Sequence, residues 1–314
     1  MNSPSACIEC LRRSWLLEML APYLERMTAK APGSPPRQLL AWQNEELTKL
    51  AAPKVAAQLL TRLASIREGQ MRDQLADAEC WACCKHSDHY PIGLRVLDDA
   101  PWALIGRGDP ALLPQTYPAR SVAIVGARRA TSYGREVARE LGRDLAAKDF
   151  IVVSGLAFGI DGCAHRGAMD EGRTVAVLGC GPDIAYPNSH RSLWRRVQEA
   201  GLVLSELPPG AAPWRWTLSA RNRIVGGLAG MTVVVEASEH SGSMVTAGVA
   251  AEIGRDVGAV PGPLTSRAST GPNALLAGGA CVVRDAQDIT DALALADRGR
   301  GEPESHTNGN RERR

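Results

Sequence analysis

The stretch VVSGLAFGIDGCAHRGAM (152–169) runs from an apolar, β-rich segment through a glycine-containing turn into the start of a helix. The first N–H groups of a helix have no partner within the helix, and loops of this shape commonly hold a phosphate on them. The stretch therefore predicts one strand–loop–helix unit of an α/β fold with an anion site at its turn. It leaves open whether the phosphate belongs to a nucleotide cofactor, a small substrate or a nucleic acid backbone.

The same alternation of apolar runs and amphipathic segments continues through most of the chain. Apolar, β-rich runs stand at SVAIV (121–125), FIVVS (150–154), TVAVL (174–178), LVLSE (202–206), MTVVVEA (231–237), VGAVP (257–261) and ACVV (280–283). Most gaps between them carry a helical pattern, such as Val137, Leu141 and Leu145 on one face of 134–147. Apolar strands that alternate with helices are typical of a parallel sheet covered on both faces. We predict an extended, Rossmann-like, doubly wound and mostly parallel sheet.

A helical region precedes this sheet. Two segments, RRSWLLEMLAPYLERM and KVAAQLLTRLASI, repeat apolar residues every three or four positions, and KAPGSPPRQ between them is rich in turn residues. We expect a small, SAM-like helical domain over 1–76 and the Rossmann-like domain over 77–296. The polar segment 297–314 is expected to be a disordered tail.

Charge and hydropathy limit the class of protein. The 36 basic and 34 acidic residues give a net charge of +2, so a site for a polyanion must be a local patch. The N-terminus carries no secretion signal, and the sequence contains no apolar run of about 18 residues that could span a membrane. We therefore expect a cytoplasmic protein that is not embedded in a membrane.

The eight cysteines are expected to be reduced thiols. They include two CxxC pairs, with further metal-ligating residues after the second: Cys7/Cys10, Cys80/Cys83, Cys84, His86 and His89. A four-thiolate zinc site needs such pairs. The two pairs lie much farther apart than those of a zinc ribbon, however, and no glycine-rich knuckle follows either of them. We predict core or surface thiols and no metal.

Four loops are expected at one edge of the sheet, because ligands of open parallel sheets bind beyond the carboxyl ends of the strands. They are GARRATSYG (126–134), SGLAFGID (154–161), GCGPDIAYP (179–187) and SEHSGSMVTAG (238–248). Small residues let a ligand approach the backbone, and a helix start offers free N–H groups. Four such loops on one edge predict an extended anion-binding surface.

A nucleotide cofactor fits these loops poorly. The first strand is followed by Gly126 and then Gly134 rather than by GxGxxG, and no carboxylate ends the second strand to bind a ribose. Gly179 and Gly181 form a GxG without the third glycine, and GxxxxGK[ST] does not occur. We predict no cofactor and no P-loop ATPase activity.

The segment PWRWTLSARNRIVGGLAG (213–230) interleaves basic and aromatic residues, and no acidic residue lies between Glu206 and Glu236. The residues concerned are Arg215, Arg221, Arg223, Trp214 and Trp216. Such a pattern can follow a single strand of nucleic acid, guanidinium to phosphate and ring to base. The tryptophans can equally be core anchors beside arginines at a solvated helix start. The pattern alone leaves both interpretations open.

Six motifs resemble, in order and spacing, those of the DNA-processing protein A family (DprA, also called Smf). They are VAIVGARR…YGREVA, VVSGLAFGIDGCAHRGA, AVLGCGPDIAYP, LSELPPG, ARNRIVGGLAG and SGSMVTAGVAAEIGRDVGAVPG, within roughly residues 87–290. The resemblance implies a cytoplasmic homodimer that binds single-stranded DNA during natural transformation and recombination. It implies that the protein protects incoming strands and helps to load the RecA recombinase, without catalysis of its own. It also suggests 255–295 as the dimer interface.

The resemblance places a DNA pocket on residues from five segments of the chain. These are Arg128, Arg129, Ser154, Gly155, Phe158, Arg215, Leu218, Arg221, Asn222, Arg223, Ser241, Gly242 and Ser243. Two of them depart from the family pattern. Phe158 stands where many relatives have a basic residue, and Leu218 stands where they have an aromatic one, a role that Trp216 is expected to take over.

The alternative function is a nucleotide phosphoribohydrolase on a related Rossmann fold. Asp161 and His165 lie four residues apart, on one helix face, where they could form an acid–base pair. Such enzymes carry a PGGxGTxxE-like loop, however, and the corresponding segment here reads SGSMVTAGVAAE. We therefore interpret Asp161 as a helix cap and His165 as its packed or hydrogen-bonded neighbour. An adaptor that binds only the recombinase is a third possibility.

Overall fold

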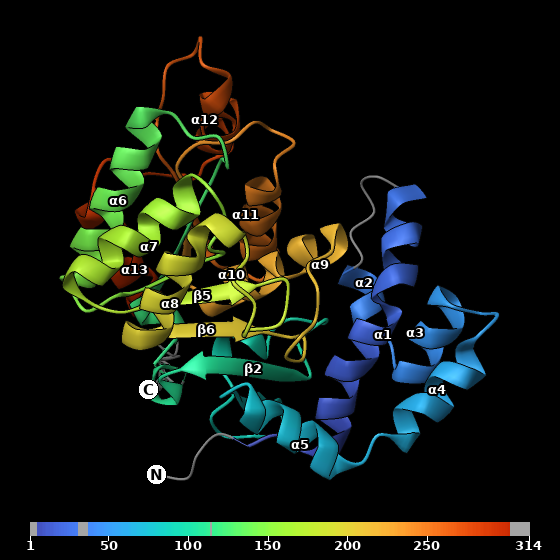
Figure 1. Ribbon diagram of the computed structural model, residues 1–314. Coiled ribbons are helices and arrows are strands. Elements are labelled where there is room, and N and C mark those ends of the chain that lie inside the picture. The colour runs from blue at the N-terminus through green and yellow to red at the C-terminus, as the bar shows by residue number, and fades with distance from the viewer. Residues whose placement is uncertain (1–4, 31–36, 114, 302–314) are drawn as a thin grey trace, which may run out of the picture.

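The computed structural model describes residues 5–30, 37–113 and 115–301. A single sheet runs through it in the order β1-β2-β6-β5-β4-β3-β7-β8-β9. Figure 1 shows β5, β6 and β2 side by side within this sheet. The strands are β1 Trp81–Cys84, β2 Ala103–Gly108, β3 Ser121–Val125, β4 Ile151–Ser154, β5 Thr174–Leu178, β6 Leu202–Ser205, β7 Met231–Val234, β8 Asp256–Ala259 and β9 Cys281–Val282. β3 to β9 are parallel to one another, whereas β2 runs antiparallel to both β1 and β6. The predicted fold class, a mostly parallel Rossmann-like sheet, is confirmed.

Helices cover both faces of this sheet. They are α6 Ser132–Ala146, α7 Ile160–Glu171, α8 Arg191–Ala200, α9 Arg215–Ala220, α10 Asn222–Leu228, α11 Gly242–Glu252, α12 Thr270–Ala277 and α13 Ala286–Gly301. Alternate residues of β3 show the two layers, because side chains along a strand point to opposite faces. Val122 and Ile124 pack with α6, α7 and α13, whereas Ala123 and Val125 pack with α10 and α11.

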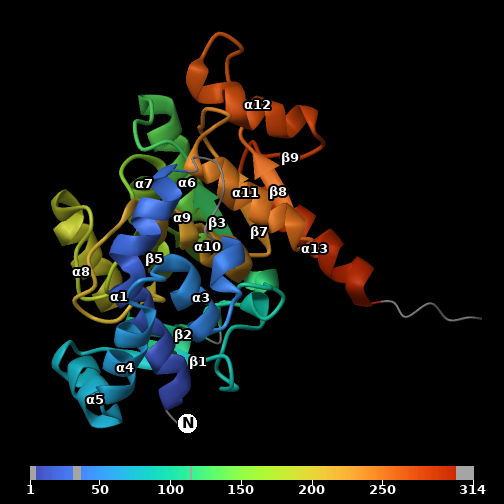
Figure 2. The ribbon, with the colours of Figure 1, turned by 90° about the vertical axis from the view of Figure 1, so that its right-hand side faces the viewer.

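The N-terminal helices pack on the antiparallel end of the sheet (Figure 2). They are α1 Ile8–Lys30, α2 Arg37–Leu40, α3 Asn44–Ala51, α4 Ala56–Ser65 and α5 Glu68–Asp77. Leu16, Leu17 and Leu20 of α1 share one buried cluster with Ala103 and Ile105 of β2. The helical region and the edge of the sheet therefore have a common core.

The C-terminal helix continues beyond the expected start of the tail. α13 runs to Gly301, past residue 296, and the remainder of the expected tail, 302–314, lies outside the described residues. None of the described helices combines the length and the apolar character that crossing a membrane requires.

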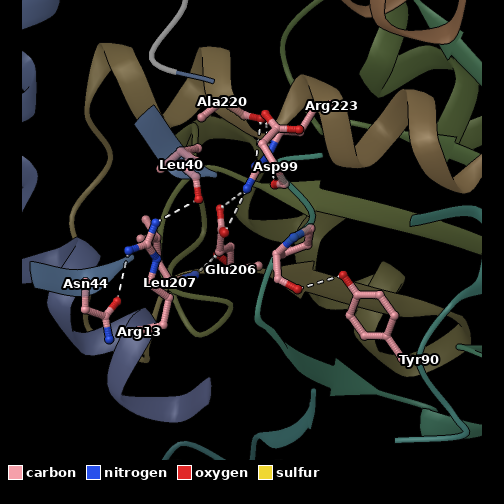
Figure 3. A network of polar contacts seen from close by, with 11 residues as sticks. Arg13, Leu40, Asn44, Tyr90, Asp99, Glu206, Leu207, Ala220 and Arg223 are labelled. Atoms are coloured by element: carbon pink, nitrogen blue, oxygen red, sulfur yellow. Dashed lines mark hydrogen bonds and ion pairs between the residues drawn. The ribbon is translucent and has the colours of Figure 1, made fainter. Parts of the chain in front are cut away.

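A buried ion network joins α10 to the segments next to β6 and β2 (Figure 3). Arg223 of α10 donates from Nη2 to both carboxylate oxygens of Glu206, at 2.8 Å each, and from Nε to the Asp99 carbonyl at 2.9 Å. Its Nε also lies 3.2 Å from the Asp99 carboxylate. The Arg223 side chain is fully buried. It therefore ties α10 to the segment after β6 and to the segment before β2.

We predict that Arg223→Met lowers the free energy of unfolding by about 3–5 kcal/mol, because it leaves two buried carboxylates without their cation. Urea unfolding of the two proteins measures the difference. Arg139→Met serves as the control, since the Arg139–Asp170 pair is exposed and such pairs contribute at most about 1 kcal/mol. A loss for Arg223→Met no larger than that of the control would show that the network does not stabilise the fold.

Candidate functional site

The strand order of the sheet reverses beside β3. From β3 the sheet continues to β4 on one side and to β7 on the other, and the helices that follow β4 and β7, α7 and α11, lie on opposite faces. Open parallel sheets bind ligands at this switch point. A hollow of about 370 Å³ lies here, and we call it the switch-point cleft. Its lining includes Gly126, Arg128, Gly155, Asp161, Arg215, Leu218, Ser219, Arg221, Asn222, Ser241, Gly242, Ser243 and Thr246.

Arg221 is the fixed cation of the cleft. Its Nη1 donates to the Val177 carbonyl at the end of β5, at 2.6 Å, and its Nη2 lies 3.6 Å from Oδ2 of Asp161. The side chain is 8% exposed, yet Nε has no acceptor among the described residues. The guanidinium is thus held in place by the protein in the lining of the cleft.

The loop after β4 is shaped to receive this guanidinium. A side chain at Gly155 would overlap the Arg221 guanidinium, so the position requires glycine. Oδ2 of Asp161 accepts from the backbone N–H groups of Gly155, at 3.2 Å, and Ala157, at 3.4 Å. The loop therefore uses two of its N–H groups on its own carboxylate, and these are not offered to a phosphate as the sequence suggested.

Burial shifts the pKa values of Asp161 and Arg221 in opposite directions. Burial raises the pKa of Asp161, and the Arg221 charge together with the two backbone N–H groups opposes that rise. Burial lowers the pKa of Arg221, and the Asp161 charge opposes that fall. Because a guanidinium does not lose its proton in proteins, the pair keeps a cation at the floor of the cleft.

The loop after β3 is anchored by a carboxylate from the neighbouring strand. Glu236 lies just beyond β7, and its carboxylate accepts two hydrogen bonds from Thr131. The Thr131 backbone N–H donates at 2.8 Å and the Thr131 hydroxyl at 2.5 Å. Thr131 in turn caps α6 by accepting from the Gly134 N–H at 3.1 Å. The position of Arg128 within this loop is therefore supported from both β3 and β7.

The start of α11 faces the cleft. The side chain of its N-cap residue, Ser241, makes no capping hydrogen bond to a backbone N–H, and its Oγ lies 2.6 Å from Oγ of Ser243. Nδ2 of Asn222 donates to the Gly242 carbonyl at 3.1 Å, which fixes α11 against α10. The positive end of the α11 dipole and two hydroxyls thus stand opposite Arg221.

A second hollow, of about 570 Å³, adjoins the cleft, and we call it the arginine groove. Its lining is Arg128, Arg129, Arg135, Phe158, Gly159, Cys163, Arg166 and His190. No acidic residue occurs among these described lining residues, and Arg128 belongs to both hollows. Together the cleft and the groove form a continuous cationic surface on a chain whose net charge is only +2.

An apolar hollow connects the two. Phe158, Tyr186 and Leu218 line it, together with Arg128 and Arg221. The Phe158 ring is 44% exposed and makes an edge-on contact with His190, with the ring centroids 5.0 Å apart. A flat apolar ligand group could thus lie between Phe158 and Leu218 while anionic groups contact the arginines.

The structure brings most of the residues singled out in the sequence to these hollows. Those in the switch-point cleft are Arg128, Gly155, Arg215, Leu218, Arg221, Asn222, Ser241, Gly242 and Ser243, and those in the arginine groove include Arg129 and Phe158. Two lie elsewhere. Ser154 is buried and donates to the Ile124 carbonyl at 2.6 Å, and Arg223 faces Glu206 and Asp99.

The tryptophans of 213–230 serve the core. Trp216 is 3% exposed and its Nε1 donates to the Ala21 carbonyl of α1 at 3.2 Å. Trp214 packs against the same buried cluster. The expectation that Trp216 takes the place of an aromatic at Leu218 is therefore wrong, because the ring anchors the N-terminal helices. The exposed aromatic ring beside the cleft is Phe158.

The interpretation of Asp161 as a helix cap is wrong. Asp161 binds the preceding loop and Arg221 rather than capping its own helix, whose N-cap is Gly159. Nδ1 of His165 lies 2.8 Å from the Thr174 hydroxyl, within the sheet. Burial, and then the charge of Arg221, lower the pKa of His165 to about 3. A neutral, fully buried imidazole is not positioned to act as an acid–base partner.

Three lining residues escaped the sequence interpretation. Arg135 and Arg166 lie in the first two turns of α6 and α7, and His190 ends a short 3-10 turn before α8. The sequence search covered the loops at the strand ends. Basic residues within the first two turns of the following helices were the signal that would have found both arginines.

Comparisons with known proteins agree with this geometry. The family model of DNA recombination-mediator protein A matches residues 81–294. A putative DNA processing protein DprA of Mycobacterium tuberculosis is 49% identical over 191 residues, 60% of this chain and 48% of that protein. The DNA processing protein DprA of Streptococcus pneumoniae is 39% identical over 203 residues, 64% of this chain and 70% of that protein. The chain thus spans about half the length of the mycobacterial relative.

Two solved structures resemble this fold, one over most of the chain and the other over about two thirds of it. The X-ray structure of DprA from Streptococcus pneumoniae has a TM-score of 0.72 at 30% identity and covers 91% of this chain and 98% of its own. A structure of DNA processing protein A from Helicobacter pylori has a TM-score of 0.60 at 29% identity, covering 68% and 96%. The latter is described by its single-stranded DNA binding mode.

We predict that His165 makes folding stability depend on pH. The unfolded chain takes up a proton on this imidazole below about pH 6.5, whereas the folded protein does so only near pH 3, so stability falls as the pH is lowered through that interval. Between pH 6.5 and 5 the loss is about 2 kcal/mol. Urea unfolding of the wild type and His165→Gln at the two pH values measures it. Parallel losses in both proteins would contradict the assignment.

Proposed function

The chain belongs to the DNA-processing protein A (DprA/Smf) family, and on that premise we propose that it binds single-stranded DNA along the switch-point cleft and the arginine groove. The observation that carries this proposal is the Arg221 guanidinium, which is fixed by Val177 and Asp161 and lines the cleft. A cation held in this way binds an anion without first losing side-chain freedom. The cleft that contains Arg221 adjoins the arginine groove, which is lined by four further arginines.

We assign phosphate contacts and base contacts to different parts of this surface. Arginines and the start of α11 suit phosphate oxygens. The exposed Phe158 ring beside Leu218 suits a base, since every base offers a flat face for stacking. Contacts of these two kinds carry little sequence information, so the preference among DNA sequences is slight.

We propose direct DNA contacts for the residues of the two hollows. They are Arg128, Arg129, Gly155, Phe158, Arg215, Leu218, Arg221, Asn222, Ser241, Gly242 and Ser243, with Arg135 and Arg166 added by the groove. Arg223 and Ser154 support the site from within the core. Phe158 replaces an ionic contact of many relatives by a stacking contact.

The family also guides the proposal for the biological role. A recombination mediator delivers single strands to a recombinase, and we propose that this protein protects incoming single-stranded DNA in the cytoplasm during natural transformation and helps to load RecA on it, without catalysis of its own. We propose a homodimer through 255–295. That segment carries two exposed apolar side chains, Val282 of the edge strand β9, which is 51% exposed, and Leu264 of the loop after β8, which is 90% exposed.

We predict that Arg128→Ala weakens binding of an oligo-dT about tenfold, or about 1.4 kcal/mol. The slope of log K against log salt becomes shallower by about 0.7, because one phosphate contact is lost. Fluorescence anisotropy across a salt series, with duplex DNA alongside, measures both. Arg173→Ala is the matched control, since Arg173 precedes β5 and lies at the opposite edge of the sheet. Equal losses for the two variants, or equal affinity for duplex, would contradict the assigned surface.

The stacking contact has a different signature. We predict that Phe158→Ala weakens oligo-dT binding by about 1–3 kcal/mol while the salt slope stays unchanged, because a ring binds a base without releasing counterions. The same anisotropy series gives both quantities. Tyr117→Ala is the control, since Tyr117 is 50% exposed and lies before β3, away from the cleft. An altered slope with unchanged affinity at low salt would assign Phe158 to another role.

A further inference from the structure

Four metal-ligating side chains meet far from the cleft, where the N-terminus crosses the edge of the sheet. They are Cys7, Cys10, Cys84 and His86, and their ligand atoms all lie within 4.8 Å of one another. Nδ1 of His86 lies 3.5 Å from Sγ of Cys7, 3.5 Å from Sγ of Cys10 and 3.9 Å from Sγ of Cys84. One imidazole nitrogen is thus surrounded by three sulfur atoms.

The fold builds this cluster from two short segments. Cys7 and Cys10 flank the first residues of α1, which begins at Ile8. Cys84 ends β1, and a turn in which the Ser87 N–H donates to the Cys84 carbonyl, at 2.8 Å, returns His86 toward it. The Cys84 N–H also donates to the Ser5 carbonyl at 3.4 Å. The two segments are therefore joined by backbone as well as by side chains.

The spacing of the ligand atoms fits a tetrahedral zinc ion. Zn–S bonds of about 2.3 Å and Zn–N bonds of about 2.05 Å place neighbouring sulfur and nitrogen atoms about 3.6 Å apart in a tetrahedron. The observed sulfur–nitrogen separations, 3.5, 3.5 and 3.9 Å, bracket that value. Three thiolates with one imidazole form a common ligand set of structural zinc sites.

We propose that Cys7, Cys10, Cys84 and His86 bind one Zn²⁺, which fastens the start of α1 to the end of β1. Cys10 and Cys84 are buried, whereas Cys7 and His86 are exposed, so the site has solvent access for metal entry. Arg95 braces the loop that carries His86, with its guanidinium donating to the carbonyls of Lys85, at 2.9 Å, and Ser87, at 2.8 Å. With four protein ligands the ion has no open position, which is typical of a structural role.

The sequence spacing pointed to a different pairing. The second CxxC pair, Cys80/Cys83, does not contribute to the cluster. Successive residues of β1 face opposite sides of the sheet, so Cys83 packs in the core under α10 while Cys84 faces α1. Only one cysteine of the CC doublet can therefore reach the CxxC at the start of α1. The expectation of unliganded thiols rested on pairing the two CxxC motifs.

The proposal is tested on the purified full-length chain, reduced and then incubated with Zn²⁺. Mass spectrometry of the metal content after gel filtration is expected to give one zinc per chain for the wild type and much less for His86→Ala and Cys84→Ser. Cobalt reconstitution of the wild type is expected to show the visible absorption of a tetrahedral thiolate site. Zinc is expected to raise the thermal midpoint of the wild type and to leave that of His86→Ala unchanged.

Matched controls come from the neighbouring residues. His89→Ala and Cys80→Ser alter the same two residue types nearby and are expected to keep the full zinc content. His86 is exposed, so its replacement tests the metal without removing a core side chain. Absence of zinc from the folded, reduced wild type would overturn the proposal, as would equal zinc in the wild type and His86→Ala. A Cys7–Cys10 disulfide that persists with zinc present would overturn it too. Each result is independent of DNA binding.

Discussion

The candidate site depends on the buried contact between Arg221 and Asp161 above Gly155. Asp161 holds the loop after β4 through two N–H groups and holds the guanidinium through its charge. Gly155 lets the guanidinium pass close to the backbone, and the Val177 carbonyl fixes its other end. Because each partner restrains the others, the cleft is already formed around a fixed cation. The Asp161 carboxylate is thus part of the scaffold of the cleft.

Arg221 and Arg223 of the ARNR motif have different roles because their side chains point in different directions. Arg221 is the N-cap residue of α10 and has helical backbone angles, and Arg223 follows two residues later, so their side chains lie roughly 200° apart around the helix axis. Arg221 therefore faces the cleft, while Arg223 points into the core and binds Glu206 and Asp99. The site and the core network consequently meet at the start of α10, and the position of Arg221 depends on how firmly Arg223 is held.

The distribution of charge matters more than its total. A net charge of +2 would not attract a polyanion by itself. The fold gathers Arg128, Arg129, Arg135 and Arg166 on one groove by placing the starts of α6 and α7 side by side. Carboxylates near this surface, Asp161 and Glu236, are bound to backbone groups and to Arg221 or Thr131. Their negative charges are thus balanced by partners within the protein, and the surface remains cationic.

The apolar runs between 121 and 283 determined the parallel sheet, since strands buried on both faces need nearly continuous apolar sequence. The glycine- and serine-rich ends of those runs likewise determined which edge carries the site. Direction and pairing of side chains were decided only in the tertiary structure. Trp216 points to α1, Asp161 to the loop before it, and Cys84, not Cys83, to Cys10. These contacts join residues distant in the chain or on opposite faces of one strand, and local spacing does not encode which face meets which partner.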